Sequence, residues 1–555
     1  MKKSLLLFLA LVSFSSSFTQ AVVTVGPYLQ SPTTTSIKVM WRSDVAATSK
    51  VMYGTSPGTL TLTATDNNSV TQHMVAITGL QPYTKYYYAV YNDNTLGAGG
   101  GNEHYFRTFP NSSDPGHVRM WAMGDFGKGN TKQQKVRDSY LNFDTVETNL
   151  WLWLGDNVYD DGLEQEYIDK VFDSVWGYKN VMRHLPFHAT PGNHDYTTIS
   201  PPGNGKPPLQ HTGPYFDFVE TYRNAEAGGV ATGHELFYSF DYRNVHFVSI
   251  NSELGNLFSA TDDWTGVNLF GGFTSSPMTQ WLHQDLQANT KEWTVVYFHQ
   301  PPYSAGSHNS SDAIERYMKA MRENFCEIIE QYGGDLVLSG HSHVYERSYL
   351  VHGSYGDDAD VSPFNIIQNT SGKESLGEAY TKYTSGPNPN LGTVYVVNGN
   401  SGSSESGSPL NHPLMYTASG CDTCIGSFVL DVDSNRMVGR YLDGYGAIRD
   451  DFTIYKLALP TSIGNVSHKP IRKVKVAPNP FSNSTLVTFE VDGSDNVNMQ
   501  LVDVSGRVIE FFNGKVTNEN PIFEIDAEKL KLAKGVYTLL INTGMDKISH
   551  KLVIQ

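Results

Sequence analysis

The chain has 555 residues, which is too long for one ordinary domain and indicates two to four. Hydrophobic residues make up 39% and charged residues 17%, and the 50 glycines, 32 tyrosines and 27 phenylalanines favour turns and strands over an all-helical fold. The formal net charge of −16 argues against a nucleic-acid partner, because a negative field repels polyanions unless a local cationic site overrides it.

Residues 1–21 have the pattern of a secretory signal peptide. Lys2 and Lys3 precede an apolar run from Leu5 to Val12, and small polar residues follow as far as Ala21. A membrane anchor would need about 18 or more apolar residues, and serines interrupt this run. We therefore expect an exported protein without a transmembrane segment.

Residues 22–110 are predicted to form a small β-sandwich. Runs such as Ser36–Trp41 and Met74–Ile77 alternate apolar with polar residues and are separated by turns. The string Leu80-x-Pro82-x-Thr84-x-Tyr86-x-Tyr88-x-Val90, together with Trp41, resembles a fibronectin type III sandwich with a tyrosine corner. The resemblance implies a scaffolding role for this domain.

Residues 116–457 change to an α/β pattern. Apolar strands are expected at Met120–Met123, Leu150–Leu154, His246–Ile250, Trp293–Phe298 and Leu336–Leu338, and helices at Thr131–Asn142, Glu164–Trp176 and Ala313–Tyr332. This alternation predicts mixed sheets flanked by helices. Segments 351–391 and 398–409 are rich in Gly, Ser, Asn and Pro, and we expect surface excursions that shape a rim.

After a linker at 458–474, residues 475–555 return to β-alternation. This tail contains Pro478-Asn479-Pro480-Phe481, Asp503-x-Ser505-Gly506-Arg507, Gly535-Val536-Tyr537 and Lys551-Leu552-Val553-Ile554. The order of these motifs resembles the C-terminal sorting domain of type IX secretion, and the alternative is an immunoglobulin-like accessory module. The resemblance implies that the secretion machinery is a partner and that the protein is secreted or held at the cell surface.

Three cysteines, Cys326, Cys421 and Cys424, are too few for a disulfide framework. The spacing Cys421-Asp-Thr-Cys424 has no second pair to complete a zinc site, so a local disulfide or two free thiols are expected there. Cys326 lies within a predicted helix, where we expect a small buried hydrophobic residue.

Five short polar motifs follow strands or precede loops in the central region. They are Gly124-Asp125-Phe126-Gly127, Gly155-Asp156-Asn157-Val158-Tyr159, Gly192-Asn193-His194-Asp195, Val296-x-x-His299 and Gly340-His341-Ser342-His343. A single Gly-Asp at a strand end is commonly just a turn, but five motifs in this order are hard to obtain by chance. Together they resemble the purple acid phosphatases of the metallophosphoesterase superfamily.

The resemblance implies a dinuclear metal centre with seven ligands. Asp156 would bridge the two ions; Asp125, Tyr159 and His343 would complete one shell, and Asn193, His299 and His341 the other. Carboxylate, phenolate, amide and imidazole groups suit iron, zinc or manganese. Since residues i and i+2 of an extended segment point the same way, His341 and His343 can each serve one metal.

Tyr159 distinguishes this chain from the wider superfamily, which usually has Asp-x-His in the first motif, where this chain has Gly127. A phenolate at Tyr159 would replace the missing imidazole and prefers a trivalent ion. The expected cofactor is therefore Fe(III) with a divalent Zn, Mn or Fe, and a tyrosinate-to-iron colour. The alternative is that Tyr159 packs beside a divalent site.

Two further histidines are expected to face the substrate. His194 follows Asn193, a predicted ligand that also lies on the substrate side, and its counterpart in the family binds phosphate oxygen or protonates the leaving alkoxide. His308, nine residues after His299, resembles a second substrate-facing histidine of plant-type enzymes. Asp195 either orients His194 or caps the following turn.

The expected function is a secreted acid phosphatase that hydrolyses small phosphate monoesters with a hydroxide held at the dinuclear centre. A phosphodiesterase or nucleotide phosphatase on the same metal scaffold is the nearest alternative, because the motifs define the chemistry more tightly than the substrate. An adhesion protein with a degenerate catalytic domain is a third interpretation. The complete set of seven predicted ligands argues against that interpretation.

Overall fold

The computed structural model describes residues 20–555 except 144, 197–212, 254–275, 357–360, 387, 406–408, 417–418, 422, 459–472, 491–493, 504–507, 518–520 and 544–546. The chain divides into two compact units, Met1–Leu459 and Pro460–Gln555. Nearly all of the predicted signal peptide and most of the predicted linker lie outside the described residues. Within the described ranges, no helix is both long and apolar enough to cross a membrane.

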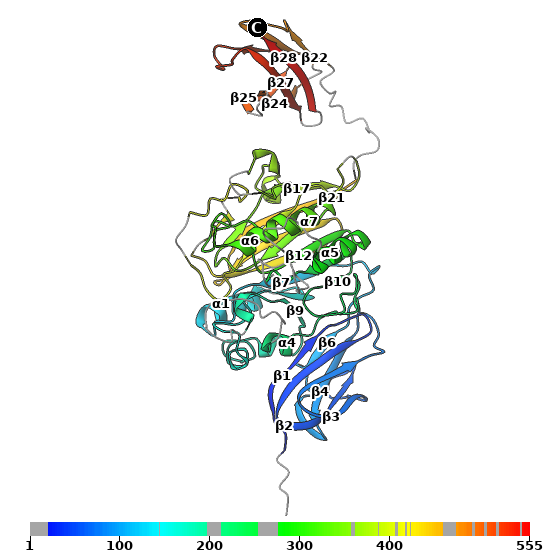
Figure 1. Ribbon diagram of the computed structural model, residues 1–555. Helices are drawn as coiled ribbons and strands as arrows, with labels where there is room; N and C mark the ends of the chain where they lie inside the picture. Colours follow the sequence, from blue (N-terminus) through cyan, green and yellow to red (C-terminus); the bar gives the residue numbers. More distant parts are fainter. Residues whose placement is uncertain are drawn as a thin grey trace, which may run out of the picture. The chain divides into compact units, whose positions relative to one another are not determined.

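The N-terminal part of the first unit is all β (Figure 1). Its strands are β1 (Val23–Gln30), β2 (Ile37–Gly54), β3 (Leu62–Ile77), β4 (Lys85–Asn92), β5 (Thr95–Gly99) and β6 (Tyr105–Arg107). The hydroxyl of Tyr86 accepts a hydrogen bond from the Gln81 N–H at 3.0 Å, which is the backbone contact of a tyrosine corner. This part also contacts the central region, because the Tyr88 hydroxyl donates to the Arg183 carbonyl at 2.9 Å.

The central part contains two sheets. The first runs in the order β17-β21-β20-β19-β7-β8-β9. Its strands are β17 (Tyr380–Tyr383), β21 (Ile448–Leu457), β20 (Arg436–Asp443), β19 (Gly426–Asp433), β7 (Val118–Met123), β8 (Leu150–Leu154) and β9 (Phe187–Thr190). Strands β7, β8 and β9 are parallel, so their carboxyl ends meet at one edge of the sheet.

The second sheet runs in the order β10-β11-β12-β13-β18-β14. Its strands are β10 (Tyr238–Tyr242), β11 (Val245–Ser249), β12 (Trp293–Tyr297), β13 (Leu336–Ser339), β18 (Val394–Asn398) and β14 (Tyr345–Arg347). Strands β11, β12, β13 and β18 are parallel. Because β19 runs antiparallel to β7 and β10 runs antiparallel to β11, both sheets are mixed, as predicted.

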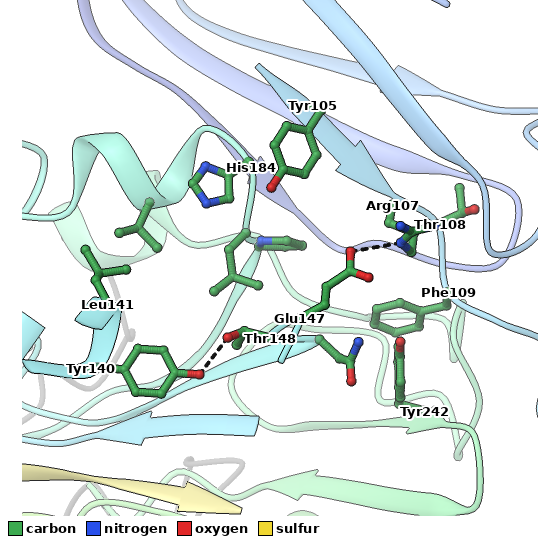
Figure 2. A pocket seen from close by; sticks show the side chains of 14 residues that line it. Tyr105, Arg107, Thr108, Phe109, Tyr140, Leu141, Glu147, Thr148, His184 and Tyr242 are labelled. Carbon is green, nitrogen blue, oxygen red and sulfur yellow. Dashed lines mark hydrogen bonds and ion pairs between the residues drawn. The ribbon is translucent and has the colours of Figure 1, made fainter. Parts of the chain in front are cut away.

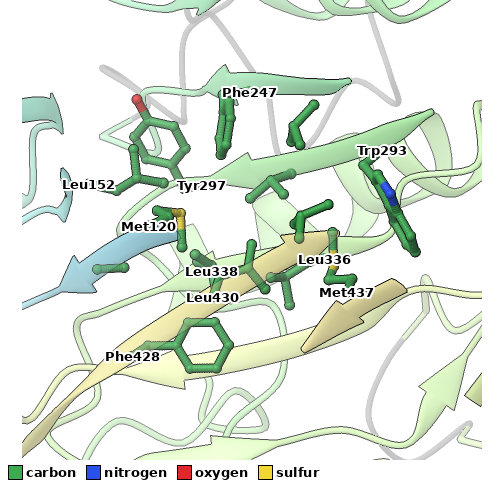
Figure 3. Packing of buried hydrophobic residues seen from close by; sticks show 14 of the residues in the cluster. Met120, Leu152, Phe247, Trp293, Tyr297, Leu336, Leu338, Phe428, Leu430 and Met437 are labelled. Atoms are coloured by element: carbon green, nitrogen blue, oxygen red, sulfur yellow. The ribbon is translucent and has the colours of Figure 1, made fainter. Parts of the chain in front are cut away.

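The main hydrophobic core lies between the two sheets (Figure 3). Met120 and Leu152 of the first sheet share it with Phe247, Trp293 and Leu336 of the second. The alternate residues of the same strands belong to the outer clusters, as the two-residue period of a strand requires. Each sheet thus buries both faces, which explains its continuous apolar runs.

Helices cover the outer faces. On the first sheet, Tyr140 of α1 (Thr131–Phe143) stacks on Trp121 with ring centroids 4.2 Å apart. On the second, Met278 and Trp281 of α5 (Pro277–Ala288) join an outer cluster that also includes Met321 of α6 (Arg316–Met321). The run continues through the π-helical turn Arg322–Cys326 into α7 (Glu327–Gln331). Shorter helices are α2 (Glu164–Glu166), α3 (Lys179–Met182) and α4 (Pro214–Phe218).

Two local predictions were wrong. The helix expected at Glu164–Trp176 ends at Val171, because the Asp173 carboxylate accepts hydrogen bonds from the Val175 and Trp176 N–H groups and stabilises a turn instead. Segment 351–391 is more than a surface excursion. It supplies β17, which pairs in parallel with β21, and β16 (Ile366–Gln368), which pairs with β15 (Leu350–Val351).

The cysteines occupy two kinds of environment. Cys421 and Cys424 form a disulfide, which is the first of the two predicted alternatives. Cys326 is free and fully buried within the helical run, as predicted.

The second unit is all β. Its strands are β22 (Lys473–Ala477), β23 (Ser484–Glu490), β26 (Ile522–Asp526), β24 (Ser494–Asp503), β25 (Val508–Thr517), β27 (Gly535–Thr543) and β28 (Lys547–Ile554). They form sheets in the orders β22-β23-β26 and β25-β24-β27-β28. The first and last quoted motifs meet here, since the Phe481 N–H donates to the Val553 carbonyl and the Val553 N–H donates to the Asn479 side chain.

Candidate metal centre

The five motifs come together at the carboxyl ends of strands from both sheets. Asp125 follows β7, Asp156 and Tyr159 follow β8, Asn193 follows β9, His299 follows β12, and His341 and His343 follow β13. Parallel strands of neighbouring sheets thus deliver seven polar side chains to one place, which is where layered α/β folds commonly hold ligands.

Three of these residues have unusual backbone conformations. Asp125, Asp156 and His341 have φ values of 57°, 48° and 66°, in the left-handed region that residues with a Cβ rarely adopt. Such strain persists only where the surrounding structure enforces it, and it is concentrated at functional sites. All three turns redirect the chain directly after a buried strand.

The first group of donor atoms surrounds the Tyr159 hydroxyl. This oxygen lies 2.9 Å from Asp125 Oδ1, 2.9 Å from Asp156 Oδ2 and 3.2 Å from His343 Nε2. His343 Nε2 is 3.4 Å from Asp125 Oδ1. Four donor atoms from three motifs therefore converge.

The second group lies on the other oxygen of Asp156. His299 Nε2 is 3.3 Å from Asp156 Oδ1 and 3.2 Å from Asn193 Oδ1. A ligand atom of His341 lies within 4.8 Å of those of Asp156 and His299. The two oxygens of one carboxylate thus face two separate sets of donors.

This donor set fits two hard or borderline metal ions. Ligand atoms about 2.1 Å from a common centre are about 3.0–3.4 Å apart. The 2.9–3.4 Å spacings of the first group and the 3.3 and 3.2 Å contacts of His299 in the second are close to this range. The second ring nitrogens of two of the predicted histidine ligands are also engaged, as is usual for metal-binding histidines: His299 Nδ1 donates to the Leu154 carbonyl at 3.0 Å, and His343 Nδ1 is 2.8 Å from Glu405 Oε1. The Nε2 lone pairs are thereby directed into the cluster.

The electrostatics of the cluster favour added positive charge. Burial disfavours the charged imidazole of His299, but Asp156 and Asp125 outweigh it and raise the pKa of His299 to about 10. Burial, followed by the charges of Asp125 and Asp156, raises the pKa of the Tyr159 phenol well above its usual value. Metal cations placed here would interact favourably with the carboxylates of Asp125 and Asp156 and would favour the phenolate form of Tyr159.

Gly127 leaves no room for a side chain. A Cβ at this position would lie 2.1 Å from the Asn157 carbonyl oxygen and 2.4 Å from the Val158 Cα. An imidazole therefore cannot enter from residue 127. The Tyr159 phenol contacts Asp125 in this part of the site.

The two predicted substrate-facing histidines both lie beside predicted ligands. The His194 ring is 4.5 Å from the Tyr159 ring, and its Nδ1 donates to the Asp160 carbonyl at 2.6 Å. The His308 ring is 3.9 Å from the His341 ring, and its side chain is 37% exposed. Both are partly open to solvent, whereas the neighbouring ligands Tyr159 and His341 are buried.

Among the described residues, the hydrogen bonds of the Asp195 side chain reach neither His194 nor a turn that follows it, and they hold the turn that precedes it. Its carboxylate accepts hydrogen bonds from the Gly192 N–H at 2.7 Å, from the Asn157 side chain at 2.9 Å and from the Tyr167 hydroxyl at 2.5 Å. Burial raises the pKa of Asp195 to about 7, and the charge of Asp156 adds to this shift.

Two acidic residues at the site were not predicted from the sequence. Glu315 Oε1 lies 2.7 Å from His308 Nδ1, and its Oε2 lies 3.5 Å from His341 Nε2. Glu405 contacts His343 from a loop 62 residues further along the chain. Single glutamates in polar segments carry no motif, so only the fold reveals them.

A separate cavity of about 140 Å³ lies where the N-terminal β domain meets the central part (Figure 2). Its lining includes Tyr105, Arg107, Glu147 and His184, and none of the seven predicted ligands. It is therefore distinct from the cluster at the strand ends.

Comparison with known families accounts for most of the chain. Residues 118–345 match the calcineurin-like phosphoesterases, residues 24–108 the N-terminal domain of purple acid phosphatases, and residues 475–555 a secretion system C-terminal sorting domain. The sorting domain indicates export.

Two curated relatives illustrate the similarity. The chain is 28% identical over 326 residues to purple acid phosphatase 15 of Arabidopsis thaliana, covering 55% of this chain and 54% of the relative. It is 24% identical over 431 residues to an acid phosphatase of Aspergillus ficuum, covering 58% and 66% respectively. The chain thus spans about half to two thirds of the length of these relatives.

Two solved structures share the fold. The purple acid phosphatase from yellow lupin (Lupinus luteus) seeds superposes with a TM-score of 0.56 at 16% identity, covering 79% of this chain and 76% of that one. PhoD superposes with a TM-score of 0.56 at 14% identity, covering 80% and 92%. The predicted fold class is confirmed.

Proposed function

We propose that this chain, which belongs to the purple acid phosphatases among the calcineurin-like phosphoesterases, is an exported phosphatase that hydrolyses small phosphate monoesters. The observation that carries the proposal is the Asp156 carboxylate, whose two oxygens face two separate groups of donor atoms. A phosphoesterase with two metal ions requires such a bridging ligand.

In this proposal, Asp125, Tyr159 and His343 hold one ion, Asn193, His299 and His341 hold the second, and Asp156 is shared. The buried Tyr159 phenol favours a trivalent ion, so we propose Fe(III) with divalent Zn, Mn or Fe. When bound, the ions would supply positive charge for the phosphoryl oxygens and acidify an attacking water.

The residues around the metal ligands have their own tasks. Because His194 Nδ1 donates to the Asp160 carbonyl, Nε2 is the atom left to hold a proton for the departing alcohol. His308, oriented by Glu315, is placed to bind a phosphate oxygen from the side of His341. Asn193 is proposed to contact the substrate as well, through its side-chain amide.

The test is to purify the mature protein aerobically, determine its metals by elemental analysis and record its visible spectrum. We expect about one iron and one further metal per chain, a broad visible band, and hydrolysis of phenyl phosphate. A colourless, active enzyme with two divalent ions would refute the ferric site and leave the phosphoesterase. Absence of both metals and turnover would refute the proposal as a whole.

The second candidate is a phosphodiesterase or nucleotide phosphatase on the same scaffold. Rates on phenyl phosphate and bis(4-nitrophenyl) phosphate separate the monoesterase from the diesterase, because a monoesterase hydrolyses the first far faster than the second.

The C-terminal domain is proposed to engage the type IX secretion machinery. Deleting residues 475–555 should then retain the protein inside the cell.

A further inference from the structure

Lys128 is a cationic residue at the mouth of the site that the motif comparison does not assign. It lies between β7 and α1, directly after Gly127, in the loop that carries Asp125. Its ammonium is 3.2 Å from the centroid of the Tyr159 ring, and the side chain is partly exposed. Lys128 therefore covers the face of a predicted metal ligand without being able to bind a metal.

The charge of Lys128 is not paired with a single carboxylate. Among the described residues, ion pairs within 4.0 Å include no contact to its ammonium, whereas the neighbouring Lys170 is 2.9 Å from Glu166 Oε1. A cation held over an aromatic face keeps its N–H donors for another acceptor. The simplest role is neutralisation of the acidic cluster, but an ion pair would serve that purpose better.

The position of Lys128 points to the leaving-group side. The His194 ring packs 4.5 Å from the same Tyr159 ring, so the ammonium and the imidazole lie around one aromatic side chain. In the proposed function, His194 holds the proton for the departing alcohol. A lysine that shares the Tyr159 ring with His194 can reach groups on that alcohol, because its ammonium is a compact charge on a flexible stem.

We propose that Lys128 binds a second anionic group, a phosphate or carboxylate, on the alcohol portion of the substrate. The inference rests on the proposed phosphatase function and specifies its substrate class: phosphate monoesters whose alcohol is itself charged. A local cation is needed for such substrates, because the net charge of −16 otherwise repels them.

The test compares phenyl phosphate with 4-carboxyphenyl phosphate, which differ by one remote carboxylate. For K128M, we expect kcat/KM on the carboxylated ester to fall about tenfold more than on phenyl phosphate, because a partly buried charge pair is lost. Using the ratio between enzymes cancels the intrinsic reactivity of the two esters. K128R, which keeps the charge, should retain most of the wild-type ratio.

K50M is the matched control. Lys50 lies 4.6 Å from the Tyr91 ring in the N-terminal β domain, so this variant removes an equal charge and a similar ring contact away from the site. It should leave both rates unchanged. Thermal unfolding of K128M and K128R shows whether either variant has lost its fold, and a folded K128R keeps the comparison informative.

The outcomes separate the two proposals. Suppose that the wild type hydrolyses both esters and that K128M lowers kcat/KM equally on both or on neither. Lys128 then does not bind the alcohol portion, and the inference is overturned while the phosphatase proposal stands. If the wild type hydrolyses neither ester, the phosphatase proposal itself has failed and the inference fails with it.

Discussion

Two buried histidines of the central part, His246 and His299, lie among carboxylates in clusters that are built differently. His246 lies 2.8 Å from Asp241 Oδ1 through Nδ1 and 2.8 Å from Asp285 Oδ2 through Nε2. His299, at the strand ends, donates Nδ1 to a backbone carbonyl and approaches Asp156 and Asn193 only to 3.3 and 3.2 Å.

The residues around His246 form an ion cluster whose charges pair with one another, whereas the residues around His299 form a donor set open to a cation. Around His246, both ring nitrogens are hydrogen-bonded, and Lys291 lies 3.4 Å from Asp241, so charge is matched within the protein. Around His299, donor atoms converge at spacings too long for strong hydrogen bonds but suited to a shared cation. Mutation should therefore affect stability at the first cluster and chemistry at the second.

The strongest test of this contrast is D156N. Replacing Asp156 with asparagine removes the negative charge of the carboxylate that both donor groups share. We therefore expect turnover to fall by about 10⁴-fold and both metals to be lost, while the fold survives. Elemental analysis, circular dichroism and phenyl phosphate hydrolysis measure these effects. Full metal content with retained activity would exclude Asp156 as the bridge.

His246→Gln should have the opposite phenotype. Leaving Asp241 and Asp285 without their buried cation should lower the free energy of unfolding by about 3 kcal/mol, with specific activity of the folded protein unchanged. Urea unfolding measures the loss. His117→Gln is the control, because His117 also lies 2.8 Å from each of two aspartates but is 30% exposed, and should cost less than about 1 kcal/mol.

The same cluster predicts a pH dependence. Burial disfavours the charged His246 ring, but its hydrogen bonds to Asp241 and Asp285 outweigh this and raise its pKa from 6.5 to about 9. Since the folded-state pKa is the higher one, this stabilisation is complete below about pH 6.5 and is lost as the pH rises through about 9. The stability gap between wild type and H246Q should therefore be largest near pH 6 and nearly closed at pH 10. A gap that stays constant would contradict a charged His246.

The ligand motifs were readable from the sequence because each is local. Asp125, Asp156 and His341 directly follow apolar strands, and the order of strands and helices was sufficient to predict mixed sheets with the motifs at their ends. A short residue pattern thus specifies which side chains meet when parallel strands bring their carboxyl ends together.

The remaining features depend on pairing across long separations. Strand β17 comes from a Gly- and Ser-rich segment and is fixed by its register with β21, which local alternation does not encode. His246 meets Asp285 because a hairpin packs against α5, and Glu405 meets His343 across 62 residues. The sequence contains these residues but no signal that they are neighbours.

The smallest effect on the open cluster is expected from E315Q. Glu315 contacts both His308, at 2.7 Å, and the predicted ligand His341, at 3.5 Å, so an amide can keep an acceptor for only one of them. We expect about a tenfold loss in metal affinity and in kcat/KM, because carboxylates that orient metal-binding histidines have effects of this size. Dialysis against a chelator, followed by elemental analysis, measures the metal affinity directly.

E327Q, at an exposed glutamate of α7, is the control and should change neither metal affinity nor kcat/KM. If E315Q retains wild-type metal affinity and turnover, its contacts with the histidines are packing alone. The donor set would then be complete without a carboxylate behind His341, unlike the charge-matched cluster around His246.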